Sequence, residues 1–352
     1  MKRIYSIDLL KLYFAFVIAF GHFELSLPGD SFAVKLFFVI SGFFLAKKFY
    51  SKSYIDEGLF TSQKRYSHKE YTLDHIKQLY PDYLFALLVM VVCSIAKISS
   101  SLFTQPISTV YLIIREFYRS IPEIFMIQEA GFFSNSFNYP AWQLCTIIIC
   151  GYFIYTMLYY CEKLSTELIF PVLFILFETY WIIGRDPFAV LAGFFPSTLA
   201  RGFAMMALGV LIYKFSESSV YAHMKSKKLL YNIFSLFVIA GLFIFKLYNG
   251  IHIIGMAVIV LYLYNIESWA NILLNRSIFK GCGKLSYSIY LNHAVVIYCI
   301  RDFIDLLSTR YNISVSFNVA CIVFGVVLTL YSVFTIWLVN KIKLHFAKKQ
   351  QK

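Results

Sequence analysis

Two ionisable residues, Lys11 and His22, lie in the first hydrophobic stretch of the chain, and both could take part in chemistry. If this stretch is a helix, their spacing puts both side chains on one face, roughly 16 Å apart along the axis. Ionisable groups inside a membrane span are costly and indicate a functional site. A neutral imidazole is a suitable general base near pH 7. In the alternative interpretation, Lys11 pairs with Asp8 and His22 only ends the helix.

Two later hydrophobic stretches also contain polar residues that could bind or react. Tyr290 and His293 are three positions apart, so on a helix both can point into one cavity. Arg201 lies within a hydrophobic stretch and needs an acceptor, either a substrate or Glu178. A single histidine on an apolar helix often has a purely structural role, and this alternative stays open for His293.

Ser41 and Trp142 are further candidates for substrate binding, each with a structural alternative. Ser41 and Gly42 form a small pair that lets another helix approach closely, which is the interpretation we favour, although Ser41 could also face His22. Trp142 could stack on a sugar, but a tryptophan at the end of a span is ordinarily an anchor at the membrane interface.

The composition is that of an integral membrane protein. Hydrophobic residues make up 59% of the 352 positions and charged residues only 14%, compared with about 25% charged in soluble proteins. We expect an all-α bundle, a single domain over residues 1–352, with ten spans. The predicted spans are 7–25, 32–47, 81–98, 141–160, 168–184, 195–213, 229–245, 251–266, 285–303 and 315–339.

The distribution of basic residues predicts that both termini are cytoplasmic. With that orientation the inner segments contain 22 of the 32 lysines and arginines and the outer segments contain 7, including Lys35. The long polar connection 48–79 is then cytoplasmic. The stretch 107–127 is apolar but contains five charged or proline residues, so we expect an interfacial or partly re-entrant helix on the outer face.

The same distribution argues against nucleic acid as a partner, although the formal net charge is +13, because the basic residues lie in short segments between apolar spans. The seven cysteines have no CxxC or Cys/His spacing, so we expect neither a disulfide framework nor a metal site. Asp8 and Lys11 interrupt the N-terminal apolar stretch and no cleavage pattern follows, so we expect a retained anchor rather than a signal peptide.

Several motifs occur in an order that resembles membrane acyltransferase family 3. A cation precedes His22 in the first span, and FFVISGF follows in the second. The family's later motifs are matched by LYPDYLFALL at 79–88, by NYPAWQL at 138–144, by Arg201-Gly202 with Gly209, and by LSYSIYLNH at 285–293. The family usually has arginine at the position of Lys11, and lysine lacks the planar fork that suits phosphate.

The resemblance implies a ten-span enzyme of the cytoplasmic membrane that transfers an acyl group, usually acetyl from acetyl-CoA, to a hydroxyl of a cell-surface glycan. It implies His22, Lys11 and His293 as catalytic candidates, and Ser41, Trp142, Arg201 and Tyr290 as candidates for binding donor or acceptor. Acetyl-CoA would be a co-substrate, with no bound cofactor. A transporter of a glycan or amphiphile and a non-catalytic membrane subunit remain alternatives, although we find no inverted repeat typical of transporters.

Overall fold

A computed structural model describes residues 3–51, 67–99, 106–128, 137–184, 190–191, 195–244 and 249–350. The described chain is almost entirely helical, which confirms the all-α class. A two-residue strand β1 (Val190–Leu191) pairs antiparallel with β2 (Phe195–Pro196). The chain divides into two compact units. Unit 1 contains Met1–Leu10, Ser31–Lys77 and Gln143–Lys280, and unit 2 contains Lys11–Asp30, Gln78–Trp142 and Gly281–Lys352.

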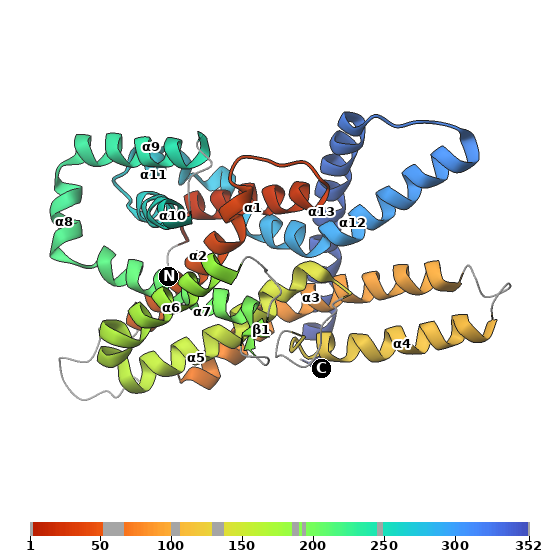
Figure 1. Cartoon of the computed structure of the whole chain (residues 1–352), viewed down its shortest axis with the longest axis horizontal. Coiled ribbons are helices and arrows are strands. Elements are labelled where there is room, and N and C mark those ends of the chain that lie inside the picture. The colour runs from red at the N-terminus through yellow and green to blue at the C-terminus, as the bar shows by residue number, and fades with distance from the viewer. Residues whose placement is uncertain are drawn as a thin grey trace. The chain divides into compact units, whose positions relative to one another are not determined.

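Figure 1 shows the order of the helices along the chain. In the first half these are α1 (Tyr5–His22), α2 (Asp30–Ser51), α3 (His68–Ser99), α4 (Pro106–Ile124), the 3-10 helix η1 (Tyr139–Ala141), α5 (Trp142–Leu164), the π-helix η2 (Ser165–Ile169) and α6 (Phe170–Gly184). In the second half they are α7 (Ser197–Ser216), α8 (Ser219–Ser226), α9 (Lys228–Ile244), α10 (Asn249–Tyr264), α11 (Trp269–Leu274), the 3-10 helix η3 (Ser277–Phe279), α12 (Cys282–Tyr311) and α13 (Phe317–Gln350).

Each predicted span overlaps one of these long helices. Within the described residues, five helical segments are long and apolar enough to cross a membrane, or six if the bent pair α8 and α9 counts as one span. The chain is therefore a multi-pass membrane protein, while the number of ten spans and the cytoplasmic position of both termini stay predictions.

One of those segments, Tyr139–Thr179, contains a break between α5 and α6. Cys161 has a non-helical backbone (φ −139°, ψ 49°). The hydroxyl of Ser165 donates to the carbonyl of Met157 at 2.9 Å. Residues eight positions apart in a straight helix are about 12 Å apart along its axis, so this bond requires a sharp bend. The geometry favours two helices here, in agreement with the two predicted spans 141–160 and 168–184.

The prediction for the third span was too short. α3 begins at His68 instead of residue 81 and continues through Pro81, so the described end of the polar connection 48–79 is helical; residues 52–66 lie outside the described residues. A capping box fixes this start. The Ser67 hydroxyl accepts from the Glu70 N–H at 3.2 Å, and the Glu70 carboxylate accepts from the Ser67 N–H at 2.8 Å.

In unit 1, α2 and α7 approach so closely that only glycine fits at two positions. A Cβ at Gly42 would lie 2.0 Å from the carbonyl oxygen of Met206, and a Cβ at Gly209 would lie 2.2 Å from that of Val39. The close packing expected beside Ser41 is therefore present. The Ser41 hydroxyl itself donates to the Phe37 carbonyl of its own helix at 2.8 Å.

Lys35 and Glu178 form a buried ion pair in unit 1. The Lys35 ammonium lies 2.5 Å from the Glu178 carboxylate, and both side chains are less than a tenth exposed. Lys35 thus lies within α2 and connects it to α6, while its place among the cations of the outer segments stays a prediction. The Glu178 carboxylate also interacts electrostatically with Arg201. Glu178 is one of the two acceptors that we considered for Arg201, the other being a substrate.

In unit 2, α12 packs against α13 (Figure 1). A buried polar network joins the two helices. The Ser288 hydroxyl donates to the Ser332 carbonyl at 3.0 Å and lies 2.9 Å from the Thr335 hydroxyl. The Asn292 amide donates to the Thr335 hydroxyl at 3.2 Å. Such bonds hold membrane helices together where lipid offers no polar partner.

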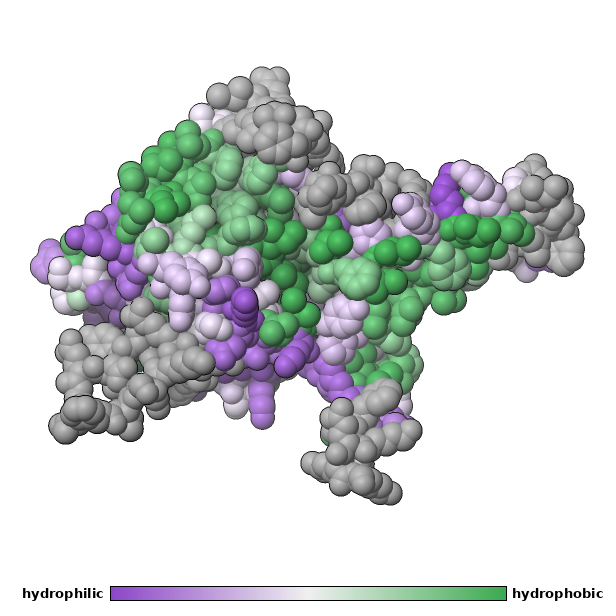
Figure 2. Space-filling model, turned by 90° about the horizontal axis from the view of Figure 1, so that it is seen from below, coloured by the Kyte–Doolittle hydropathy of each residue, from purple (hydrophilic) through white to green (hydrophobic). Residues whose placement is uncertain are grey.

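Helix α4 exposes apolar side chains and buries polar ones. Tyr111, Ile114 and Tyr118 are each more than 60% exposed, whereas Thr109 and Glu123 are buried. Figure 2 shows hydrophobic side chains along the arm that α3 and α4 form. This inverted pattern suits a helix in contact with lipid, as expected for 107–127; its side of the membrane stays a prediction.

We predict that Gly209→Ala destabilises the protein, because the new methyl would lie against the backbone of α2. We expect a loss of about 1–3 kcal/mol in stability, visible as a lower melting temperature of the purified protein. Gly241→Ala in α9 is the matched control, since a Cβ there meets nothing within 4 Å. Equal melting temperatures for the two variants would contradict the close contact of α2 and α7.

Candidate active site

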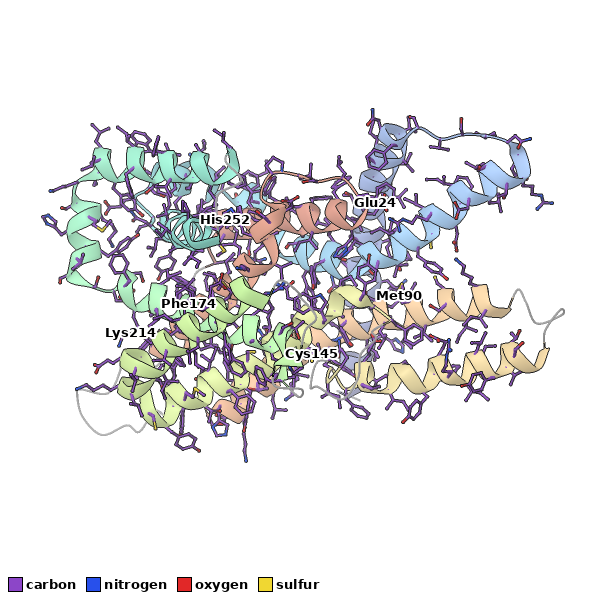
Figure 3. All side chains as sticks on the ribbon, viewed as in Figure 1. Glu24, Met90, Cys145, Phe174, Lys214 and His252 are labelled. Atoms are coloured by element: carbon purple, nitrogen blue, oxygen red, sulfur yellow. The ribbon has the colours of Figure 1, made fainter. Side chains whose placement is uncertain are left out.

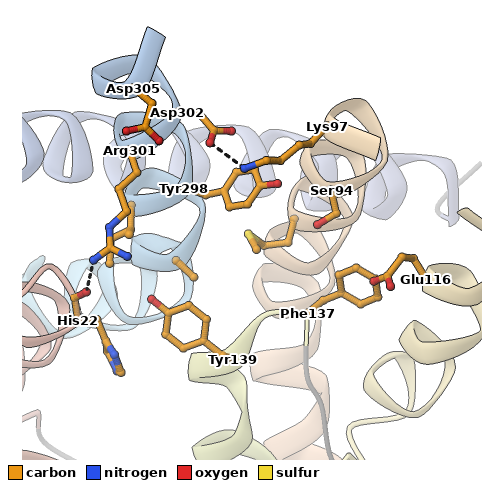
Figure 4. A pocket seen from close by; sticks show the side chains of 13 residues that line it. His22, Ser94, Lys97, Glu116, Phe137, Tyr139, Tyr298, Arg301, Asp302 and Asp305 are labelled. Carbon is orange, nitrogen blue, oxygen red and sulfur yellow. Dashed lines mark hydrogen bonds and ion pairs between the residues drawn. The ribbon is translucent and has the colours of Figure 1, made fainter. Parts of the chain in front are cut away.

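Unit 2 contains an open cavity of about 680 Å³ into which several polar side chains project (Figure 4). The end of α1, the later part of α3, helix α4, the segment 137–139 and α12 all contribute to its wall. Its lining includes His22, Lys97, Glu116, Phe137, Tyr139, Tyr298, Arg301, Asp302 and Asp305. The cavity is therefore built from segments distant in the sequence.

Three aromatic rings meet at one wall of this cavity. The rings of His22 and His293 are stacked, with centroids 5.2 Å apart and planes 16° apart. The Tyr139 ring meets His22 edge-on at 5.0 Å and His293 at 5.9 Å. His22 lines the cavity, whereas His293 lies behind it and is fully buried. The structure thus brings together two of the predicted catalytic residues.

The tautomer of His293 follows from its hydrogen bond. Its Nδ1 lies 2.9 Å from the backbone carbonyl of Tyr290. A carbonyl can only accept, so Nδ1 carries the proton and Nε2 is the basic nitrogen. Among the described residues, Nε2 of His293 has no hydrogen-bond partner. The bond therefore fixes which tautomer the neutral His293 ring adopts, and it restrains the ring beside His22.

A buried carboxylate positions the segment that carries Tyr139. Glu123 of α4 is completely buried, and its carboxylate accepts from the backbone N–H of Phe137 and from that of Asn138, the latter at 3.2 Å. Its own carbonyl accepts from the Tyr83 hydroxyl at 2.6 Å. In an apolar environment these backbone groups need a partner inside the protein, and Glu123 is that partner.

Helix α12 holds the same segment from the other side. The Asn138 amide donates to the Leu291 carbonyl at 3.2 Å, and the Tyr290 hydroxyl donates to the Pro140 carbonyl. Tyr290 therefore positions η1 with its hydroxyl, and it positions the His293 ring with its own backbone carbonyl. This arrangement assigns it a positioning role and places its hydroxyl away from the cavity lining.

Charged side chains surround the opening of the cavity. Arg301 bonds the Glu24 carboxylate at 2.8 Å, and its guanidinium lies 3.5 Å from the His22 carbonyl; Glu24 follows the end of α1 (Figure 3). Lys97 bonds Asp302 at 2.9 Å. With Glu116 and Asp305, the described lining has three carboxylates and two permanent cations, so this part of it is slightly acidic.

The other predicted residues do not line this cavity within the described chain. Lys11 is half-buried on α1, half the helix away from His22, and Asp8 accepts a bond from Arg3 at 2.5 Å. Trp142 is half-buried directly after η1. Ser41 and Arg201 belong to unit 1.

Sequence reasoning missed Tyr139, Lys97, Arg301 and Asp302. Arg301 lies near the end of a predicted span, and its guanidinium contacts the backbone carbonyl of His22. A helical signal was present, because His293, Ile297 and Arg301 recur every four positions and mark one face of α12. Nothing in the sequence shows that this face meets Tyr139.

A family model described as an acyltransferase domain matches residues 4–339, nearly the whole chain. The chain belongs to membrane acyltransferase family 3. Membership supports a membrane acyltransferase activity in general terms, with an acyl donor and a hydroxyl acceptor. A comparison with curated proteins gave no match, and a comparison with solved structures gave none either.

We predict that Glu123→Gln destabilises this acyltransferase by about 1.5–3 kcal/mol, because the amide keeps one acceptor oxygen and turns its NH₂ toward a second donor. The variant should have a lower melting temperature and, at a temperature where it is folded, a lower transfer rate. Glu167→Gln is the control, since Glu167 is exposed in η2. Wild-type stability in Glu123→Gln would show that the carboxylate does not hold the segment 137–139.

Proposed function

We propose that this enzyme transfers an acetyl group from acetyl-CoA to a hydroxyl of a cell-surface polysaccharide or lipid-linked glycan in the cytoplasmic membrane, with His22 as the general base. One observation carries the proposal. In a member of an acyltransferase family, an imidazole lines a polar cavity large enough for a sugar, and a second imidazole and a tyrosine ring hold it in place.

The proposed reaction follows from the chemistry of a neutral imidazole. His22 removes the proton of the acceptor hydroxyl while the hydroxyl oxygen attacks the thioester carbonyl. The tetrahedral intermediate collapses, the carbon–sulfur bond breaks, and the CoA thiolate leaves. The His22 imidazolium then returns the proton to the thiolate, so that the products are an O-acetyl ester and CoA.

The stacked pair supports the neutral state that this step needs. Two imidazolium rings 5.2 Å apart would repel each other strongly in surroundings of low polarity, so both cannot be charged together. The complete burial of His293 favours its neutral form, because an apolar environment disfavours the charged ring. His293 thus gives His22 a neutral surface to stack on and limits its rotation.

The lining of the cavity suits a hydroxyl-rich acceptor better than the donor's phosphates. Its carboxylates can accept hydrogen bonds from sugar hydroxyls, and Lys97 and Arg301 can donate to sugar oxygens. The rings of Tyr139 and Tyr298 offer apolar faces for a sugar ring. The slightly acidic charge would repel CoA phosphates, so we assign this cavity to the acceptor and the attraction of the donor to Lys11.

Labelled acetyl-CoA tests the role of His22 with purified protein in lipid and a crude glycan extract as acceptor. We predict that His22→Ala lowers transfer about 10²–10⁴-fold while the fold is retained. His293→Ala should cause a smaller loss. His223→Ala is the matched control, since His223 is exposed on α8. Wild-type transfer in His22→Ala would move the base elsewhere, with His293 the next candidate.

A second prediction concerns Lys11. Replacement by alanine should raise the KM for acetyl-CoA roughly 10- to 100-fold, the worth of a hydrogen bond to a charged group. Lys11→Arg, which restores the residue usual in the family, should keep the wild-type KM. Unchanged KM and kcat in Lys11→Ala would remove Lys11 from the donor site.

The assay also separates the alternatives. No thioester consumption by the wild type, together with uptake of a glycan or amphiphile into vesicles, would favour transport. Absence of both activities would favour a non-catalytic subunit.

A further inference from the structure

Unit 1 contains two adjoining cavities that the proposed reaction does not use. The first, of about 340 Å³, is polar and lies where the start of α1 meets the ends of α2, α7 and α10. The second, of about 360 Å³, is a groove between α7, α8, α9 and α10 lined almost wholly by apolar side chains. Tyr221 of α8 lines both, so the two cavities adjoin at its side chain.

The polar cavity carries an excess of positive charge. Arg3, Lys47 and Lys225 line it, and Glu217 is the one carboxylate in its described lining. Arg3 is also bonded to Asp8 outside the lining, which leaves a net charge of about +1 when Asp8 is included. The Asn275 side-chain oxygen accepts from the Tyr5 N–H at 2.8 Å, so its NH₂ remains a donor for an anion.

Aromatic rings hold two of these cations in place. Lys47 lies 4.6 Å from the centre of the Tyr264 ring, and Lys225 lies 4.8 Å from that of Tyr221. A cation over an aromatic face keeps its charge and loses part of its freedom. Both ammonium groups are therefore positioned in advance for an anionic group between them.

The apolar groove opens to the surface that faces lipid. Phe234 and Ile254 line it and are 49% and 59% exposed, and their neighbour Phe237 on α9 is 77% exposed. In a bilayer an acyl chain fills such a groove without a hydrophobic gain, because lipid tails are as apolar as the side chains. Selectivity must then come from the headgroup end.

Tyr221 is fixed between the two cavities. Its hydroxyl donates to the Leu261 carbonyl at 3.2 Å and lies 3.0 Å from the Tyr231 hydroxyl. Its ring can therefore separate a charged headgroup from an acyl chain without turning. A groove that is apolar at one end and basic at the other is complementary to an amphiphile with an anionic head.

We propose that unit 1 binds an anionic phospholipid, with the headgroup phosphate among Arg3, Lys47 and Lys225 and one acyl chain in the groove beside Tyr221. The predicted topology places the basic cavity at the cytoplasmic leaflet, where anionic lipids carry the surface charge. The phosphates of CoA share the headgroup's chemistry but have no acyl tail that reaches such a groove, so the two sources can be separated.

The test is a titration of the purified full-length protein, followed by native mass spectrometry. Phosphatidylglycerol should bind at least tenfold more tightly than phosphatidylcholine with the same chains. The double variant Lys47→Gln/Lys225→Gln should lose roughly 25-fold in affinity for phosphatidylglycerol, about fivefold per lysine. Lys214→Gln is the matched control, because Lys214 (Figure 3) lies near the same end of α7 but faces Glu162 at 4.0 Å.

Two further experiments identify the ligand, one with a variant that fills the groove and one with CoA as a competitor. Ala257→Phe fills the groove and should weaken phosphatidylglycerol but leave soluble glycerophosphoglycerol unchanged. Free CoA should not displace the lipid. Equal binding of the two lipids by the wild type overturns the proposal even if a variant fails to fold. Displacement by CoA with no effect of Ala257→Phe also overturns it and makes the basic cavity a donor site. None of these readouts depends on turnover, so they are independent of the proposed reaction.

Discussion

The buried carboxylate of Glu123 is the interaction on which the arrangement of the site depends. The backbone at 137–139 is not α-helical, so its N–H groups need acceptors other than the carbonyls of an α-helix. Glu123 accepts from two of them. Because these bonds fix the start of η1, they also fix the position of the Tyr139 ring, and Tyr139 restrains the two imidazoles. A buried charge outside the cavity lining thus sets the geometry of the proposed base, His22.

As a consequence, the proposed general base, His22, is held without a carboxylate partner among the described residues. Many histidine bases are oriented by an acid that also stabilises the imidazolium. Here the described contacts of His22 are aromatic stacking and a bond to its backbone carbonyl from Arg301. Such contacts orient the ring and favour its neutral form, as the proposed removal of a proton from a sugar hydroxyl requires.

The sequence predicts the helices well because their signal is local. Long apolar runs and the basic residues between them locate the long helices, although several of these helices extend further than predicted, and α4 was expected as an interfacial helix. The start of α3 was missed although Ser67 and Glu70 form a capping box, because the polar residues after them looked like a loop. These polar residues nevertheless form the first turns of α3.

The site was predictable only in part, because its contacts join distant segments. His22 and His293 could be named from their types and from the resemblance, but their stacking depends on 270 residues of intervening chain. Glu123 appeared as a charge that argued against a span, and no pattern shows that it bonds the backbone 14 residues later. Arg301 and Lys97 looked like groups at the ends of spans because their partners, Glu24 and Asp302, come from pairings that only the fold defines.

The most direct measurement of the central claim is chemical rescue of His22→Gly by imidazole. Acetyl transfer by the purified variant would be followed at increasing imidazole concentration, with His293→Gly measured in parallel. If His22 is the base, added imidazole restores transfer in His22→Gly with saturation, and its effect rises with pH as neutral imidazole accumulates. If imidazole restores nothing in His22→Gly but rescues His293→Gly, the base is His293. The proposed role of His22 in deprotonating the acceptor is then wrong.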